Sequence, residues 1–164
     1  MLKIFLLRHG ETAWNADNNR YCGRSDIPLT EKGIRQAEEV KKQMKGIELT
    51  KVFSSPLQRA FTTARIASGR EPIKDDRLTE ADFGAWEGKT KEEFIAENES
   101  LWLDWMSDPA IHRAGGSGET GAQIVARVSD FSVPCNIPVT KEISWWWGTT
   151  ALTACTWQAS WVCH

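Results

Sequence analysis

Two arginines and one histidine stand where this sequence could assemble a phosphate-binding site. Arg8 and His9 follow an apolar run at residues 3–7, and Arg59 lies in the first turn after a second run at residues 51–55. Because ligands gather at the carboxyl ends of parallel strands, two guanidinium groups and a helix N-terminus would converge there on a phosphate. His9 between them would be a nucleophile or a base beside a dianion. Surface charge at two loop ends is the alternative, and spacing alone does not decide between the two interpretations.

The runs that would position these residues have the pattern of buried strands. The first, "KIFLL", is almost continuously apolar, which favours a strand of a parallel sheet covered on both faces. After the second run, the segment "SPLQ" at residues 55–58 predicts a capping box with proline at the first helical position and a helix through Ala67. Another helix is predicted to begin at Thr30. Its expected apolar side consists of Ile34, Ala37, Val40 and Met44.

The second half of the sequence contains two further helix starts. Thr90–Glu93 and Thr120–Gln123 each have the spacing of a capping box. The second would open a helix with an apolar stripe, and the tryptophans between the two are expected to pack in the core or in a lid. Strands that alternate with helices predict an α/β domain with a mainly parallel sheet. The stripe consists of Ile124, Val128 and Phe131, and the tryptophans are Trp102 and Trp105.

Four segments together indicate a family. "LLRHGETAWN", "RSDIPLTEKG", "SSPLQRAFTTA" and "RLTEADFGAWEG" closely resemble the histidine phosphatase superfamily, the phosphoglycerate mutase-like group. They occur in the family's order and spacing from Met1 to about Phe131. The resemblance implies a three-layer α/β/α fold with a mainly parallel sheet, whose C-terminal part is disrupted in this chain. It divides the chain into an incomplete histidine phosphatase domain at residues 1–131 and an aberrant tail at residues 132–164.

The resemblance assigns two catalytic roles. His9 matches the histidine that attacks phosphorus and becomes a phosphohistidine, which a neutral imidazole can do if its other nitrogen donates to a carbonyl. Glu80 matches the carboxylic acid that protonates the leaving oxygen and could later deprotonate water. The family needs no metal, and no cofactor is expected.

The resemblance also assigns binding roles to five residues. The arginines match those that bind the phosphoryl oxygens, with planar forks that suit a charge spread over three oxygens. Asn15 matches a further phosphate ligand. Cys22 and Gly23 fall in the family's substrate-contacting loop, although packing is the favoured role for Cys22. Structural hydrogen bonding explains Asp26 and Glu87 as well as substrate contact does. The predicted phosphate- or substrate-binding residues are thus Arg8, Asn15, Cys22, Gly23 and Arg59.

Composition narrows the partners. The chain of 164 residues is 41% hydrophobic and 26% charged with a net charge of −2, which argues against a strongly basic nucleic-acid-binding surface. The N-terminus lacks the features of a signal peptide, and no cysteine pair has the spacing of a zinc site. We therefore expect a cytoplasmic protein that binds neither nucleic acid nor a membrane. The family resemblance implies in addition that it is an enzyme acting on a small phosphorylated metabolite.

The last part of the chain differs from the rest. Residues 143–164 contain no Asp, Glu, Lys or Arg, although five of the nine tryptophans lie there. The family has a second histidine in a strand-end motif like "VVGHNG", expected in this region. Read one base out of frame, the codons of residues 145–148 must spell Val-Val-Gly, and the next three codon junctions permit His-Asn-Gly. We hypothesise that the chain after about Phe131 is an out-of-frame translation. A membrane anchor, which needs about 20 predominantly apolar residues, and a tryptophan-rich interaction tail are the weaker alternatives.

The expected activity is phosphoryl transfer from a phosphomonoester. The segment "GRSDIPLTEKG" resembles the small phosphatase branch, which includes α-ribazole phosphatase-type enzymes, so phosphatase is favoured. A phosphoglycerate mutase-type phosphotransferase is the alternative. Another is that the chain as written is a non-catalytic phosphate-binding remnant, because loss of the second histidine motif would remove both core packing and a phosphate ligand.

Overall fold

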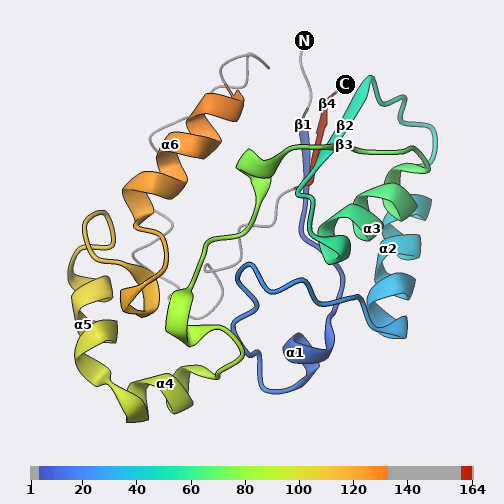
Figure 1. Ribbon diagram of the computed structural model, residues 1–164. Helices are drawn as coiled ribbons and strands as arrows, with labels where there is room; N and C mark the ends of the chain where they lie inside the picture. The colour runs from blue at the N-terminus through green and yellow to red at the C-terminus, as the bar shows by residue number, and fades with distance from the viewer. Residues whose placement is uncertain (1–3, 133–159, 164) are drawn as a thin grey trace.

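The computed structural model describes residues 4–132 and 160–163, which form a sheet with helices on both sides (Figure 1). Most of the predicted tail, at residues 133–159 and 164, lies outside the described residues. The re-read "VVGHNG" segment at residues 145–151 lies there too, so the frame hypothesis remains a prediction.

The sheet has four strands in the order β1 (Ile4–Leu7), β4 (Ser160–Cys163), β2 (Lys51–Ser54) and β3 (Ile73–Lys74). β2 and β3 pair in parallel, whereas β4 pairs antiparallel with both β1 and β2. Three strands therefore share one direction, as predicted. The fourth, which comes from the tail, runs against them between β1 and β2.

Helices cover the two faces of the sheet. α2 (Glu31–Gln43) and α3 (Gln58–Ser68) lie on one side, and α6 (Gly121–Ser132) lies on the other (Figure 1). Adjacent residues of β2 point to opposite layers, as the pleat of a strand requires. Val52 packs in the cluster that contains Ala64 of α3, whereas the ring of Phe53 meets Phe131 of α6 at a centroid distance of 5.3 Å. This arrangement confirms the three-layer α/β/α fold.

Three helix starts follow the sequence pattern. Thr30 caps α2 by accepting a hydrogen bond from the backbone N–H of Gly33, and Thr90 forms a complete capping box at α4 (Lys91–Glu97). Thr120 and Gln123 form both hydrogen bonds of the capping box predicted at the start of α6. On the apolar side predicted for α2, Ala37 is buried but Ile34 is 38% exposed. The predicted stripe on α2 is therefore only partly turned toward the core.

One predicted capping box is wrong. α3 begins at Gln58, its N-cap residue is Leu57, and no side chain of that residue caps it. Ser55 lies too early and accepts instead from the N–H of Leu57. The N–H of Gln58 is in the first turn and has no acceptor within the helix. It donates to the carboxylate of Asp26 at 2.7 Å, so a residue from a distant loop caps α3. This long-range contact has no local sequence signal.

A second core, rich in aromatic side chains, lies away from the sheet. Trp102 and Trp105 of α5 (Glu99–Ser107) are buried there against Trp86, as the core interpretation predicted. Phe94 of α4 stacks on Trp86 at a centroid distance of 4.6 Å. α6 closes this core through Ile124, while its Phe131 reaches the sheet.

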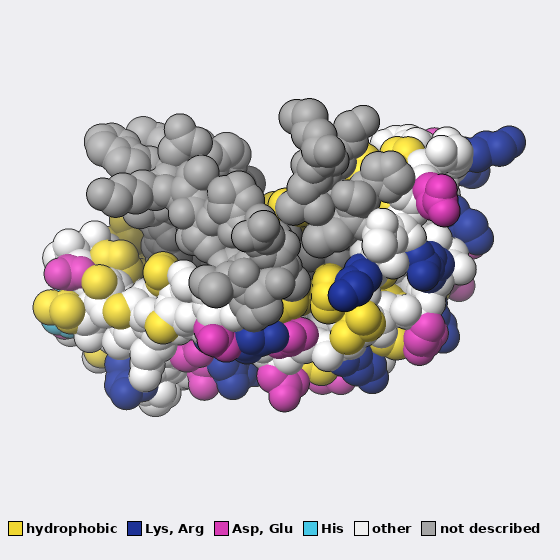
Figure 2. Space-filling model, turned by 90° about the horizontal axis from the view of Figure 1, so that it is seen from above, with side chains coloured by type: hydrophobic (Ala, Val, Ile, Leu, Met, Phe, Trp, Pro, Cys, Tyr) yellow, Lys and Arg dark blue, Asp and Glu magenta, His cyan; other side chains and the backbone are white. Residues whose placement is uncertain are grey.

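The surface is mixed in charge. On the face seen in Figure 2, lysine, arginine, aspartate and glutamate side chains are interspersed with hydrophobic ones. Exposed apolar residues of α5 and α6 are Leu103, Met106 and Val125. No helix among the described residues is long and apolar enough to cross a membrane.

Candidate active site

His9 lies just beyond the carboxyl end of β1 and is only 8% exposed. Its Nδ1 lies 2.7 Å from the carbonyl oxygen of Gly10, which can only accept. Nδ1 therefore carries the proton, and the lone pair is on Nε2. Burial lowers the pKa of His9 to about 4, and the positive charges of Arg59 and Arg8 add to this, so the ring is neutral at pH 7.

Gly10 ties this strand end to α3. Its N–H donates to Thr63 Oγ1 at 3.0 Å, and the same hydroxyl donates to the carbonyl of Arg59 at 2.8 Å. A Cβ at Gly10 would come within 2.3 Å of the carbonyl oxygen of Gly33 in α2, so only glycine fits. The local hydrogen bonds thus set His9 against the first turn of α3.

Arg59 is completely buried in that first turn of α3. Its Nη1 donates to the carbonyl of Ser25 and its Nη2 to the carbonyl of Gly23, both at 2.6 Å. Burial lowers the pKa of Arg59, but an arginine still remains charged at neutral pH. Arg8, by contrast, has an exposed side chain. The guanidinium of Arg59 is therefore held by backbone carbonyls, whereas Arg8 is exposed at the same strand end.

Asn15 belongs to the short helix α1 (Ala13–Ala16), which Thr12 caps. Asn15 Oδ1 accepts from the N–H of Thr12 at 3.0 Å and from its hydroxyl at 2.9 Å. The side-chain amide N–H groups of Asn15 make no hydrogen bond within the described part of the chain and can donate to an anion. Arg8, His9 and Asn15 line a common cavity of about 410 Å³.

Glu80 lies in an irregular stretch between the 3₁₀ turns η1 (Asp76–Leu78) and η2 (Gly84–Trp86) and is 2% exposed. Burial raises its pKa to about 7, against the opposing effects of the Ala81 N–H, which donates at 2.9 Å, and of nearby arginines. A substantial fraction of Glu80 is therefore protonated at pH 7. It does not line the cavity that Arg8 and His9 share.

Cys22 and Gly23 belong to the loop that binds the guanidinium of Arg59. The buried thiol of Cys22 lies 3.7 Å from Thr12 Oγ1, and burial raises its pKa, so it is a poor nucleophile. Packing remains the favoured role for it. Gly23 has φ +48°, and a Cβ there would come within 2.0 Å of Glu87 Oε1. Its carbonyl contributes directly to holding Arg59.

Residues 4–132 match the family described as the histidine phosphatase superfamily, branch 1. The chain belongs to this superfamily. The resemblance seen in the sequence is thereby confirmed.

Similar proteins of the superfamily include phosphatases and a mutase. The chain is 36% identical over 134 residues to phosphoserine phosphatase 1 of Hydrogenobacter thermophilus, covering 80% of this chain and 63% of that protein. It is 43% identical over 105 residues to the probable phosphoglycerate mutase GpmB of Cronobacter sakazakii, covering 62% of this chain and 48% of the other. The chain thus spans between about half and just under two thirds of the length of these two relatives.

Solved structures show the same fold. A putative alpha-ribazole-5'-P phosphatase of Escherichia coli matches with a TM-score of 0.74 and 30% identity, covering 83% of this chain and 67% of that one. The YhfR protein of Bacillus stearothermophilus matches with a TM-score of 0.70 and 31% identity, covering 82% and 66% of the two chains.

Two motif residues of the histidine phosphatase resemblance have structural partners. Glu87 accepts from the backbone N–H groups of Arg24 and Ser25, at 2.8 and 3.0 Å, and from the Ser25 hydroxyl at 2.6 Å. Asp26 caps α3. Both carboxylates therefore hold the loop whose carbonyls hold Arg59.

Sequence reasoning missed three contributors to this candidate site. Thr63 joins α3 to the strand end, whereas Glu119 and Arg127 form an ion pair next to the Glu80 segment. Thr63 lies one helical turn after Arg59, so its hydroxyl could have been predicted on the same face. The Glu119–Arg127 pair has no comparable signal in the sequence, because the backbone groups that it binds, at Arg77 and Asp82, are far away along the chain.

Proposed function

We propose that the chain hydrolyses phosphomonoesters through a phosphohistidine on His9. The observation that carries this proposal is the state of the imidazole. Its Nδ1–H faces the carbonyl of Gly10, and its pKa is lowered to about 4. A neutral ring with a free Nε2 lone pair beside two arginines suits attack on a phosphoryl group. The superfamily membership supports the same reaction class.

In the first step, Nε2 of His9 forms a bond to phosphorus while the bond from phosphorus to the ester oxygen breaks. Arg8 and Arg59 stabilise the negative charge on the non-bridging oxygens, and Asn15 donates to one of them. The departing oxygen takes its proton from the neutral carboxyl group of Glu80. The products are the free alcohol and a phosphohistidine.

In the second step, water attacks the phosphohistidine. The Glu80 carboxylate formed in the first step accepts a proton from this water as its oxygen bonds to phosphorus. The P–N bond then breaks, inorganic phosphate leaves, and His9 and Glu80 return to their starting states. A pKa near 7 allows Glu80 to serve in both directions.

We propose hydrolysis rather than transfer to a second hydroxyl of the substrate. The loop "GRSDIPLTEKG" and the likeness to proteins called phosphatases support this choice. The likeness to a probable phosphoglycerate mutase keeps transfer as the second candidate. Release of phosphate from p-nitrophenyl phosphate, without isomerisation of 3-phosphoglycerate, is the expected result. Isomerisation faster than phosphate release would favour the mutase. The proposed natural substrate is a small phosphorylated metabolite, with no metal or other cofactor.

We further propose that the chain as written is impaired. Among the described residues the only other histidine is His112, which lies in the stretch between α5 and α6. Sequencing the coding DNA tests the frame hypothesis, because a codon other than His across the Gly148–Thr149 junction would exclude it. The frame-restored protein should show much higher phosphatase activity, and equal activity of the two proteins would refute the impairment.

A further inference from the structure

The segment that carries Glu80 has little regular structure of its own. It runs from the single 3₁₀ turn η1 to the single turn η2, without a helix or a strand between them. A general acid nevertheless has to lie within hydrogen-bond reach of the oxygen that it protonates. Contacts from other parts of the chain must therefore fix the position of Glu80.

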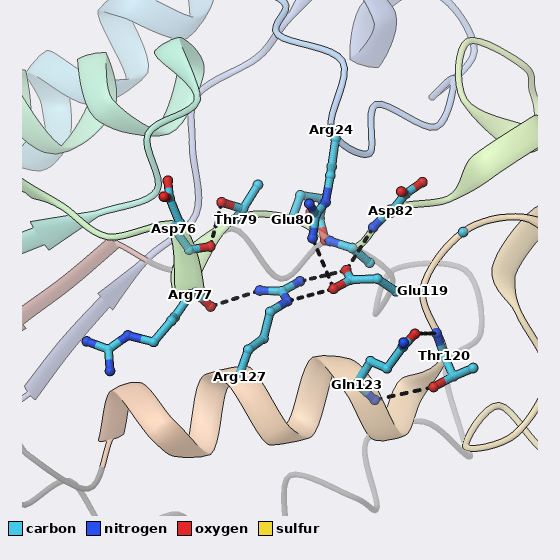
Figure 3. A network of polar contacts seen from close by, with 12 residues as sticks. Arg24, Asp76, Arg77, Thr79, Glu80, Asp82, Glu119, Thr120, Gln123 and Arg127 are labelled. Atoms are coloured by element: carbon cyan, nitrogen blue, oxygen red, sulfur yellow. Dashed lines mark hydrogen bonds and ion pairs between the residues drawn. The ribbon is translucent and has the colours of Figure 1, made fainter.

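Arg127 supplies the first of these contacts. Arg127 belongs to α6, and its Nη1 donates to the backbone carbonyl of Arg77 at 2.8 Å (Figure 3). Arg77 lies in η1, at the start of the Glu80 segment. The other side of the same guanidinium faces Glu119, with Nε to Oε1 and Nη2 to Oε2 both at 3.0 Å. Such a two-bond fork fixes orientation as well as distance. The two side chains are only 16% and 15% exposed, which limits screening by solvent.

Glu119 supplies the second contact, just after Glu80. Its Oε2 accepts from the N–H of Asp82 at 3.1 Å, and its own N–H donates to the carbonyl of Asp82 at 2.9 Å. Its Oε1 also lies 3.0 Å from Nη2 of Arg24, in the loop that holds Arg59 (Figure 3). Glu119 therefore connects the Glu80 segment to the phosphate-binding side of the site.

We propose that Arg127 and Glu119 are positioning residues that hold the two ends of the Glu80 segment and thereby place its carboxyl group at the leaving oxygen. The inference rests on the proposed function, since it presumes that Glu80 is the general acid. It adds two residues that do not touch the substrate. Losing them should impair protonation of the leaving group more than binding of the phosphoryl group.

Substitutions can separate the effect of the positive charge of Arg127 on Glu80 from the effect of its hydrogen bonds. Three arginines, Arg59, Arg127 and Arg8, act electrostatically on Glu80, and Glu80 in turn acts on the Cys22 thiol. Arg127→Lys keeps the positive charge but loses the fork, whereas Arg127→Met loses both. Glu119→Gln keeps the shape and removes the partner charge. If positioning is the function, lysine should not rescue the arginine.

The kinetic test compares kcat/KM for two substrates in the full chain. p-Nitrophenolate leaves as a stable anion and needs little help from an acid, whereas the alkoxide of β-glycerophosphate needs a proton. Arg127→Lys, Arg127→Met and Glu119→Gln should each lower kcat/KM for β-glycerophosphate by about 10- to 100-fold, the order expected for a displaced acid, and for p-nitrophenyl phosphate by less than about 3-fold. Equal losses on both substrates, or full rescue by lysine, would overturn the inference. The matched control is Arg35→Met, at an exposed arginine of α2, which should change neither value.

Amide hydrogen exchange tests the same inference without activity. In Arg127→Lys, exchange at residues 79–82 should accelerate by about tenfold or more, while α2 and α3 keep their protection. Unchanged exchange at residues 79–82 would overturn the positioning role. Absence of hydrolysis in the unmutated chain together with faster exchange in the variant would instead count against the proposed function alone.

Discussion

The two ends of the site are built in different ways. At the phosphate end, His9 follows strand β1 and Arg59 lies in the first turn of α3, so regular elements position both side chains. At the acid end, Glu80 lies in an irregular stretch, and the ion pair between Arg127 of α6 and Glu119 holds its neighbours. The first end depends on the sheet and its packing. The second depends on a few side-chain hydrogen bonds, so the two ends should fail separately.

The largest effect is expected at the phosphate end. His9→Ala removes the nucleophile and should lower hydrolysis of p-nitrophenyl phosphate by about 10⁴-fold or more, with no phosphoenzyme formed. Rapid-quench labelling with a phosphate-labelled substrate measures the intermediate. His112→Ala is the matched control and should behave as the unmutated chain. Acid-labile labelling that persists in His9→Ala would exclude this nucleophile.

Loss of the acid should produce a smaller and more selective effect. Glu80→Gln keeps the size of the side chain but cannot donate its proton. We expect kcat/KM for β-glycerophosphate to fall by about 10²- to 10³-fold, as removal of a general acid does, and for p-nitrophenyl phosphate to fall far less. A parallel fall for the two substrates would show that the two ends do not have separate functions.

The acid end should also make stability depend on pH. The pKa of Glu80 is about 7 in the folded chain against an ordinary value of 4.5, so the folded state holds its proton more tightly than the unfolded state. This contribution to the free energy of unfolding is complete below pH 4.5 and is lost as the pH rises through 7, by up to about 3 kcal/mol. Urea unfolding at pH 5 and pH 8 should show that Glu80→Gln removes this loss. The same pH dependence in both proteins would contradict the burial of Glu80.

The smallest effect concerns the pH profile of kcat/KM. His9 must be neutral and Glu80 protonated, so activity should fall below pH 4 and above pH 7, by about tenfold for each pH unit beyond either value. Glu80→Gln should lose the alkaline fall and keep the acid one. An alkaline limb that persists in this variant would assign it to another group.

The difference between the two ends also separates the features of the site that the sequence predicted from those that it did not. The apolar run before His9 and the helix that contains Arg59 have local signals, so both residues could be placed at strand ends, although spacing alone did not decide that they form one site. Glu80 was predicted only through the family resemblance, because nothing in its neighbourhood indicates burial. The caps of α2 and α4 were predicted because Thr30 and Thr90 lie next to the groups that they bond.

Features that depend on distant partners could not be predicted. Asp26 caps α3 across 32 residues, and Glu119 reaches back 37 residues to Asp82. The antiparallel position of β4 between β1 and β2 was likewise unexpected, because the local composition of a strand does not state its direction. Each of these contacts is set by the tertiary fold and not by periodicity.

The most direct test of the account is the phosphoenzyme of Glu80→Gln. With p-nitrophenyl phosphate, the good leaving group departs without an acid, but water attack lacks its base. A rapid-quench experiment with peptide mapping should therefore find close to one acid-labile phosphoryl group per chain, attached to His9. Absence of an accumulated phosphoenzyme, or a phosphoryl group on another residue, would contradict the assignment of His9 as nucleophile and Glu80 as the group that moves the protons.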